Sequence, residues 1–73
     1  MNEFALAEVV WGACKRYDIS GYLARIELDT ATLRVIIAAS DHYCDLVRDA
    51  IREDCPTWLS VQVRVAKHHG ERK

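Results

Sequence analysis

The spacing of its apolar residues is the feature that most limits how this chain can fold. Over residues 3–17 they recur every three or four positions, which is the period of an amphipathic helix. Over residues 22–28 they alternate, as in a strand with one face in solvent, and residues 33–39 form a nearly continuous apolar run. The helical spacing returns at 40–54 and the alternation at 59–66. The sequence therefore predicts the element order α-β-β-α-β.

These periods also predict which side chains form the core. The first helix is expected to bury a stripe made of Leu6, Val9, Val10, Ala13, Cys14 and Tyr17. The second is expected to bury Tyr43, Cys44, Leu46, Val47, Ala50 and Ile51. Alternation in the first strand separates an inward set of Tyr22, Ala24, Ile26 and Leu28 from an outward set of Leu23, Arg25 and Glu27. In the last strand the inward set is Leu59, Val61, Val63 and Val65.

Three residues mark the expected boundaries of these elements. Gly21 supplies the positive φ of a turn after the first helix. Ser40 is placed to cap the second helix, because its hydroxyl can accept an unpaired backbone N–H. Pro56, the single proline, stops that helix. Residues 29–32 form a short loop, so the first two strands are expected to pair as an antiparallel hairpin.

A chain of 73 residues has room for one small domain. The predicted fold class is α+β, a two-layer α-β-β-α-β domain in which two helices cover one face of a three-stranded mixed sheet. The last three elements form a β-α-β unit, whose crossover is expected to be right-handed. We expect this single domain to span residues 1–67 and a polar C-terminal tail to follow at 68–73.

Charge and cysteine content limit the class of protein and its compartment. The formal net charge is -1, which argues against a protein that coats nucleic acid chiefly by neutralising phosphates. Cys14, Cys44 and Cys55 are odd in number and form no C-x-x-C pair, so we expect reduced core thiols. A metal site that joins them to His42 is the less favoured interpretation. Without a basic signal segment or an apolar run of membrane length, the predicted location is cytoplasmic.

The sequence contains no motif for catalysis or for a cofactor. It lacks G-x-G-x-x-G, G-x-x-x-x-G-K-[ST] and H-E-x-x-H, and it has three glycines from which such loops could be built. Asp41 and His42 are adjacent, but no serine or cysteine is placed by motif as a nucleophile beside them. We therefore expect a protein that is not an enzyme, with no catalytic residue, no metal site and no cofactor.

The first helix carries the strongest candidate for a binding surface. At about 100° per residue, the side chains of Phe4 and Trp11 fall on the side of the helix opposite the apolar stripe. The expected partner-binding set is Phe4, Ala7, Glu8, Trp11 and Lys15. Exposed aromatic residues on a helix are typical of a surface that binds another protein. The alternative is that Trp11 folds over the sheet edge as part of the core, and Trp58 is open to the same two interpretations.

Two further surfaces are weaker candidates. The second helix is expected to expose an acidic ridge made of Asp41, Asp45, Asp49 and Glu53. This ridge could dock a basic partner, but Arg48 and Arg52 lie among its carboxylates, as on an ordinary solvated helix face. The open sheet face and the start of the tail offer candidate nucleic-acid contacts through Arg25, Arg34, Arg64 and Lys67.

The segment from the second strand onward resembles a known family. Its pattern is Leu33-x-Val35-x-Ile37-x-Ala39-Ser40-x-x-Tyr43-x-x-x-Val47-Arg48-x-x-Ile51, followed by Val61-x-Val63-x-Val65. This half of the chain resembles the pseudo-KH domains of bacterial replication proteins, namely the N-terminal domain of the initiator DnaA and the DciA-type helicase loaders. The resemblance implies a domain that docks replication proteins, sometimes with weak single-stranded DNA contact, and it places Trp11 on the partner-facing helix. The chain departs from the DnaA-like pattern by one leading helix in place of two, which favours an adaptor or inhibitor over an initiator.

The sequence therefore predicts a small protein-binding module, an adaptor or inhibitor, that docks a larger partner through its first helix. One alternative is a single-stranded nucleic-acid-binding domain that uses the open sheet face and the basic tail. Sequence-specific RNA reading is disfavoured, because no G-x-x-G loop is present to clamp a backbone. The other alternative is a homodimerisation module in which an exposed edge strand pairs with its copy in a second chain.

Overall fold

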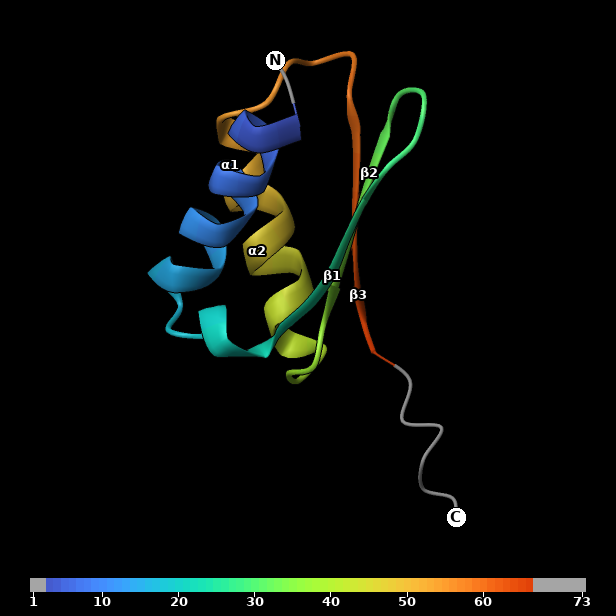
Figure 1. Cartoon of the computed structure of the whole chain (residues 1–73). Coiled ribbons are helices and arrows are strands. Elements are labelled where there is room, and N and C mark those ends of the chain that lie inside the picture. Colours follow the sequence, from blue (N-terminus) through green and yellow to red (C-terminus); the bar gives the residue numbers. More distant parts are fainter. Residues whose placement is uncertain (1–2, 67–73) are drawn as a thin grey trace.

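The computed structural model of the chain describes residues 3–66. Its elements are α1 (Glu3–Arg16), the short 3-10 helix η1 (Ser20–Tyr22), β1 (Leu23–Leu28), β2 (Thr32–Ile37), α2 (His42–Glu53) and β3 (Ser60–Val65). The strands form one sheet in the order β1-β2-β3, with β1 antiparallel and β3 parallel to β2. Both helices lie on one side of this sheet (Figure 1). The predicted α+β class and element order are confirmed, while the expected tail at 68–73 lies outside the described residues.

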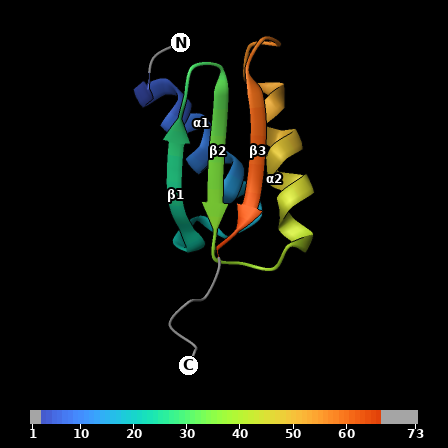
Figure 2. The same ribbon diagram turned by 90° about the vertical axis from the view of Figure 1, so that its right-hand side faces the viewer.

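The β-α-β unit has the expected hand. Seen from the open face of the sheet, β2 and β3 point in the same direction, downward, and β3 lies to the right of β2 (Figure 2). The helix that connects them, α2, lies on the far side of the sheet in this view. This arrangement is a right-handed crossover, the form that almost all such units adopt.

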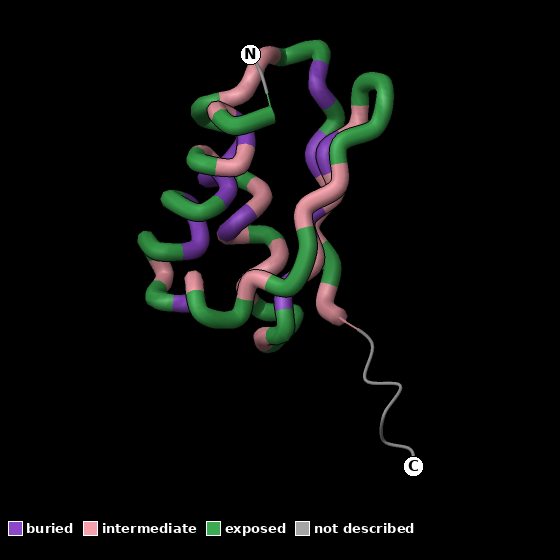
Figure 3. The backbone as a smooth tube through the Cα atoms, viewed as in Figure 1, coloured by how far each residue is buried: buried purple, intermediate pink, exposed green. Residues whose placement is uncertain are grey.

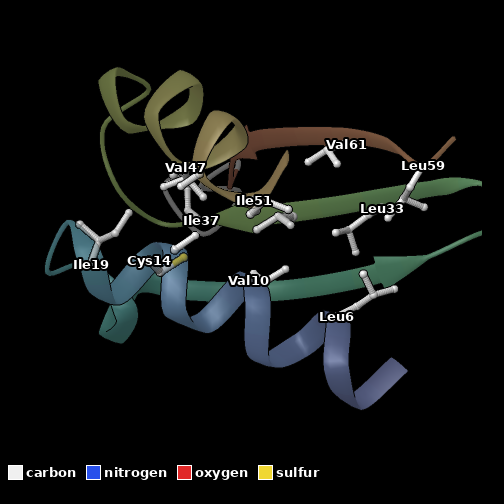
Figure 4. Close-up of a cluster of buried hydrophobic side chains, with 13 residues drawn as sticks. Leu6, Val10, Cys14, Ile19, Leu33, Ile37, Val47, Ile51, Leu59 and Val61 are labelled. Atoms are coloured by element: carbon white, nitrogen blue, oxygen red, sulfur yellow. The ribbon is translucent and has the colours of Figure 1, made fainter. Parts of the chain in front are cut away.

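The central strand β2 is the element on which the core is built. Its side chains at Leu33, Val35 and Ile37 have no exposed surface. Both helices and β3 point apolar side chains at them, as the close-up in Figure 4 shows for several of the set. The buried contributors outside β2 are Leu6, Val10, Ala13, Cys14, Ile19, Val47, Ala50, Ile51, Leu59 and Val61. The helical stripes predicted from the sequence are therefore the faces that meet the sheet, except at Leu46, which was expected in the core but is only half-buried at its margin.

The end of α1 differs from the prediction. Gly21 does not have a positive φ and lies in η1, whereas Asp18 has a φ of 60°. The N–H of Asp18 donates to the C=O of Lys15 at 3.0 Å, and the N–H of Ile19 donates to the C=O of Cys14 at 2.9 Å. These two bonds are the Schellman pattern that ends a helix, and the buried Ile19 and Cys14 supply the apolar contact that accompanies it. The left-handed residue is an aspartate because Asp tolerates this conformation better than most side chains.

The start of α2 is close to the prediction. The Ser40 hydroxyl accepts a hydrogen bond from the backbone N–H of His42 at 3.3 Å, which is the capping role expected of it. The residue next to the helix is nevertheless Asp41, whose side chain makes no capping bond. The prediction of Ser40 as the N-cap is therefore right in its chemistry and one residue early in its position.

The predicted alternation of β1 is wrong at its beginning. The register with β2 shifts between Leu23 and Arg25, which is a β-bulge at Ala24. As a result Leu23 packs against the core, although strict alternation places it in solvent, and Ala24 is exposed. Tyr22, also expected to face inward, precedes the strand and is 56% exposed. Only beyond the bulge does the predicted alternation hold.

We expect truncation of a buried α2 side chain to cost far more than truncation at its margin. Ile51→Ala should lower the free energy of unfolding by about 2–5 kcal/mol, because Ile51 is fully buried and its removal leaves a cavity. The matched control is Leu46→Ala in the same helix, where the side chain is only half-buried. Urea unfolding followed by circular dichroism gives both values, and an equal loss in the two variants would contradict this core.

The positive φ at Asp18 leads to a second prediction about stability. Asp18→Gly should raise the free energy of unfolding by about 0.5–1 kcal/mol, because glycine adopts a positive φ without steric cost. Gly21→Ala is the control and should not lower stability, since an added Cβ would meet no atom within 4 Å. The same urea experiment measures both. If Gly21→Ala were destabilised and Asp18→Gly unchanged, the residue with positive φ would be Gly21 and not Asp18.

Candidate functional site

The outer face of α1 exposes two large aromatic side chains. Phe4 is 83% and Trp11 51% exposed. The inner face of the helix is already occupied by buried Leu6 and Val10, so the sheet has no room beneath it for either ring. The burial map in Figure 3 shows this alternation along α1 as exposed and buried segments. Neither Trp11 nor Trp58, which is 65% exposed, is among the buried core residues.

A shallow groove of about 730 Å³ runs beside these rings, between α1 and the outer edge of β1. All five members of the predicted set line it, and the sequence missed three others. The lining residues are Phe4, Ala7, Glu8, Trp11, Gly12 and Lys15 from α1 and Leu23 and Ile26 from β1. The lining is mostly apolar. We call it the α1–β1 groove.

Strict alternation did not predict Leu23 in the groove, because the bulge at Ala24 reverses the side of the sheet to which Leu23 points. Leu23 reaches the groove only because the register shift at Ala24 brings it to the same side of the sheet as Ile26. A sequence signal did exist, since Leu23 is an apolar residue at a position that alternation assigns to solvent. Such a misplaced apolar residue next to a small one is what a bulge produces.

One charged side chain interacts directly with the aromatic surface. The Lys15 Nζ lies 5.2 Å from the centroid of the Trp11 ring, within the range of a cation–π contact. Lys15 is itself exposed and is one of the lining residues of the groove. Glu8, on the same face, provides the opposite charge. The groove is therefore apolar with one positive and one negative group at its border.

The outer edge of β1 adds backbone groups to this surface. β1 pairs only with β2 among the described strands, so its other edge carries no strand. The Asp29 N–H donates to the Thr32 C=O at 2.9 Å, which makes this pair the first hydrogen-bonded rung of the hairpin. Because such rungs alternate along an antiparallel pair, Glu27 and Arg25 bond to β2, and Ile26 and Leu28 direct their N–H and C=O groups outward.

The acidic ridge of α2 is exposed, but most of its charge is paired. Guanidinium nitrogens of Arg48 lie 3.2 Å from a carboxylate oxygen of Asp45 and 3.4 Å from one of Asp49. A guanidinium nitrogen of Arg16 in α1 lies 3.8 Å from a carboxylate oxygen of Glu53. The fourth member, Asp41, is exposed next to the start of the helix. Such exposed pairs contribute little to stability, and they leave little net charge for a basic partner. The ridge matches the ordinary solvated helix face that the sequence also allowed.

The open face of the sheet gathers the three predicted arginines. Arg25 and Arg64 flank Ile36 on the neighbouring strands, and Arg34 lies two residues before Ile36 on the same face. The Arg25 Nε lies 2.7 Å from the Glu27 carboxylate, so one of the three charges is balanced. The fourth predicted nucleic-acid contact, Lys67, lies outside the described residues.

A smaller hollow of about 470 Å³ lies between the two helices. Its apolar lining is small, three alanines, Gly12 and Val9, and the charged residues Glu8, Arg16 and Asp54 also line it. Within residues 3–66 it contains no aromatic side chain and no apolar side chain larger than that of Val9. The α1–β1 groove is therefore the better candidate site.

The three cysteines are free thiols in surroundings that disfavour the thiolate. Among residues 3–66, no three or more histidine, cysteine or acidic side chains gather as metal ligands would. Burial raises the pKa of the Cys14 thiol. Burial also raises the pKa of Cys44, helped by Asp41 and Asp45, and the pKa of Cys55, helped by Asp54. All three thiols are therefore disfavoured as thiolate nucleophiles.

Comparisons with protein-family models, with curated proteins and with solved structures give no significant match. The resemblance to pseudo-KH domains of replication proteins therefore stays a prediction. No helix within residues 3–66 combines the length and the apolar content that crossing a membrane requires.

The raised thiol pKa values predict slow alkylation and a fall in stability at alkaline pH. Near pH 7 the folded chain should react with a thiol reagent far more slowly than the urea-unfolded chain, with buried Cys14 slowest. As pH rises past the unfolded thiol pKa, the unfolded chain loses protons that the folded chain still holds, so the free energy of unfolding should fall. Rates from an Ellman assay and urea midpoints across the alkaline range measure both effects. Rapid modification of Cys14 in the folded chain would contradict its burial.

Proposed function

We propose that this chain is a small non-catalytic protein-binding module, an adaptor or inhibitor, that docks its partner on the α1–β1 groove. The observation that carries the proposal is the exposure of Phe4 and Trp11 beside a mostly apolar groove. Burying such a side chain is worth about 1.5–3 kcal/mol, so covering both rings favours association. Tryptophan is also among the residues enriched where binding energy concentrates.

The shape of the groove favours a protein over a small molecule. Small-molecule sites are concave and direct several polar groups inward, whereas this groove is shallow and open along β1. Its charged groups, Glu8 and Lys15, lie at the border, as polar residues do around a protein interface. The resemblance to pseudo-KH domains supports the same function and suggests replication proteins as partners.

Replacement of Trp11 tests this function. Trp11→Ala should weaken capture of the partner at least about tenfold, because hot-spot residues cost about 2 kcal/mol or more when truncated. The thermal midpoint should change little, because Trp11 is half-exposed and is not among the buried core residues. Trp58→Ala is the matched control, since Trp58 is 65% exposed and does not line the groove. Both variants are compared by affinity capture and by thermal unfolding.

A loss of stability in Trp11→Ala with binding intact would assign Trp11 a structural role. Equal loss of binding in Trp11→Ala and Trp58→Ala would place the docking surface elsewhere. Either result would overturn the proposal.

The arginines on the open sheet face favour a second candidate function, single-stranded nucleic-acid binding. Within residues 3–66, Arg34 and Arg64 have no acidic contact comparable to that between Arg25 and Glu27. Guanidinium groups can contact phosphates and stack on bases.

Titration with a labelled single-stranded oligonucleotide at two salt concentrations tests the second candidate. Affinity should fall as salt rises, because contacts to phosphates release counterions. The double variant Arg34→Gln/Arg64→Gln should reduce both the affinity and the salt dependence. No binding at low salt would exclude this function.

A further inference from the structure

We propose that the partner which the α1–β1 groove fits is a second copy of this chain, paired antiparallel through the outer edge of β1. The inference rests on the proposed function, because it names the occupant of the same groove. It is carried by the charge pattern of β1, by the backbone groups on its outer edge and by the apolar side chains beside that edge.

The outer edge of β1 has the backbone groups that an added strand would pair with. Ile26 and Leu28 direct their N–H and C=O groups away from β2, as the hydrogen-bonded rung at Asp29 and Thr32 requires. If Ile26 lies opposite Ile26 of the second copy, the two residues exchange a pair of hydrogen bonds across a two-fold axis. Because this axis is perpendicular to the sheet, the two open faces stay on one side and both pairs of helices on the other.

The charges of β1 select that register. With Ile26 at the two-fold axis, Arg25 of each chain lies opposite Glu27 of the other, so two pairs of opposite charge form on the open face. Moving the axis to Arg25 would place two arginines opposite each other, and moving it to Glu27 would place two glutamates opposite each other. Opposite charges stabilise a cross-strand pair and like charges destabilise it.

The ion pair within each chain is compatible with these contacts. Arg25 and Glu27 already face the same side of the sheet, with 2.7 Å between the Nε atom and the carboxylate. The Arg25 guanidinium has five N–H groups, so it can contact its own Glu27 and Glu27 of the second copy together. Arg25 and Glu27 bond to β2, so across the new pair they occupy non-hydrogen-bonded positions, where facing side chains are closest.

The helix side of the edge supplies the apolar contact. Leu28 is 44% exposed at the end of β1, and Phe4 and Trp11 border the groove next to Ile26. In the paired arrangement the two grooves face each other, and the side chains of each α1 cover the Ile26 side chains of both chains. The same apolar surface that suits a protein partner is therefore covered by its own copy.

Variants that change the charges at Arg25 and Glu27 test the register. Light scattering of the whole chain should give a mass near twice 8.3 kDa at high concentration. Arg25→Glu and Glu27→Arg should each weaken the dimer at least about tenfold, because each converts both cross-strand pairs to like charge. An equimolar mixture of the two variants should recover dimers, since both glutamates of one variant then face the two arginines of the other. The double variant Arg25→Glu/Glu27→Arg should also dimerise, and circular dichroism checks that each variant is folded.

Hydrogen exchange gives a measurement that needs no variant. The amide proton of Ile26 should be protected at high protein concentration and lose that protection on dilution. The amide of Glu27 is the internal control, because it bonds to β2 in either state. Concentration-independent exchange at Ile26 would overturn the proposal.

Failure of this inference is distinguishable from failure of the proposed function. The chain could stay monomeric at all concentrations and still capture a different protein, with capture lost in Trp11→Ala. That result would overturn the proposal of a second copy and keep the protein-binding function. If Trp11→Ala weakens the dimer but Arg25→Glu and Glu27→Arg do not, the proposed β1 register is wrong. Dimers that neither change affects overturn both proposals.

Discussion

The structure depends on covering one face of β2 with two helices. Leu33, Val35 and Ile37 have no exposed surface, and the fully or nearly fully buried side chains of α1 and α2 that cover them are Leu6, Val10, Ala13, Cys14, Val47, Ala50 and Ile51. The inner stripe of α1 therefore leaves no space for Phe4 or Trp11, and the helix must place both rings outside. The exposed aromatic surface follows from the one-sided core, because a three-stranded sheet with a single helical layer has no second apolar layer to enclose them.

The element order could be predicted because it follows from local periodicity. The helical stripes of α1 and α2 and the run of β2 each specify a face without knowledge of the rest of the chain. What could not be predicted are the points where the backbone departs from a regular period. The bulge at Ala24 changes the side to which Leu23 points, and the left-handed residue falls on Asp18 although Gly21 is better suited to it. The Schellman bonds of α1 fix that position, and they depend on where the helix ends.

The same distinction applies to the candidate site. Phe4, Ala7, Glu8, Trp11 and Lys15 share a face because the helical repeat places them there, so the α1 side of the groove could be read from spacing alone. Leu23 and Ile26 complete the groove only through packing of β1 against α1, a contact between distant segments. The cluster of Arg25, Arg34 and Arg64 is intermediate, since alternation predicts their common face and the strand register brings them around Ile36.

The outer edge of β1 connects the fold to its proposed partner. An unpaired edge strand is prone to join any other exposed strand, and proteins commonly prevent this with lysine, proline, a bulge or a covering element. β1 contains neither lysine nor proline. Its bulge lies at one end, and its two charges have opposite sign and adjoin Ile26 from either side. Such an arrangement opposes the neighbouring registers by like-charge repulsion while it favours one self-complementary register, so the edge is selective rather than blocked.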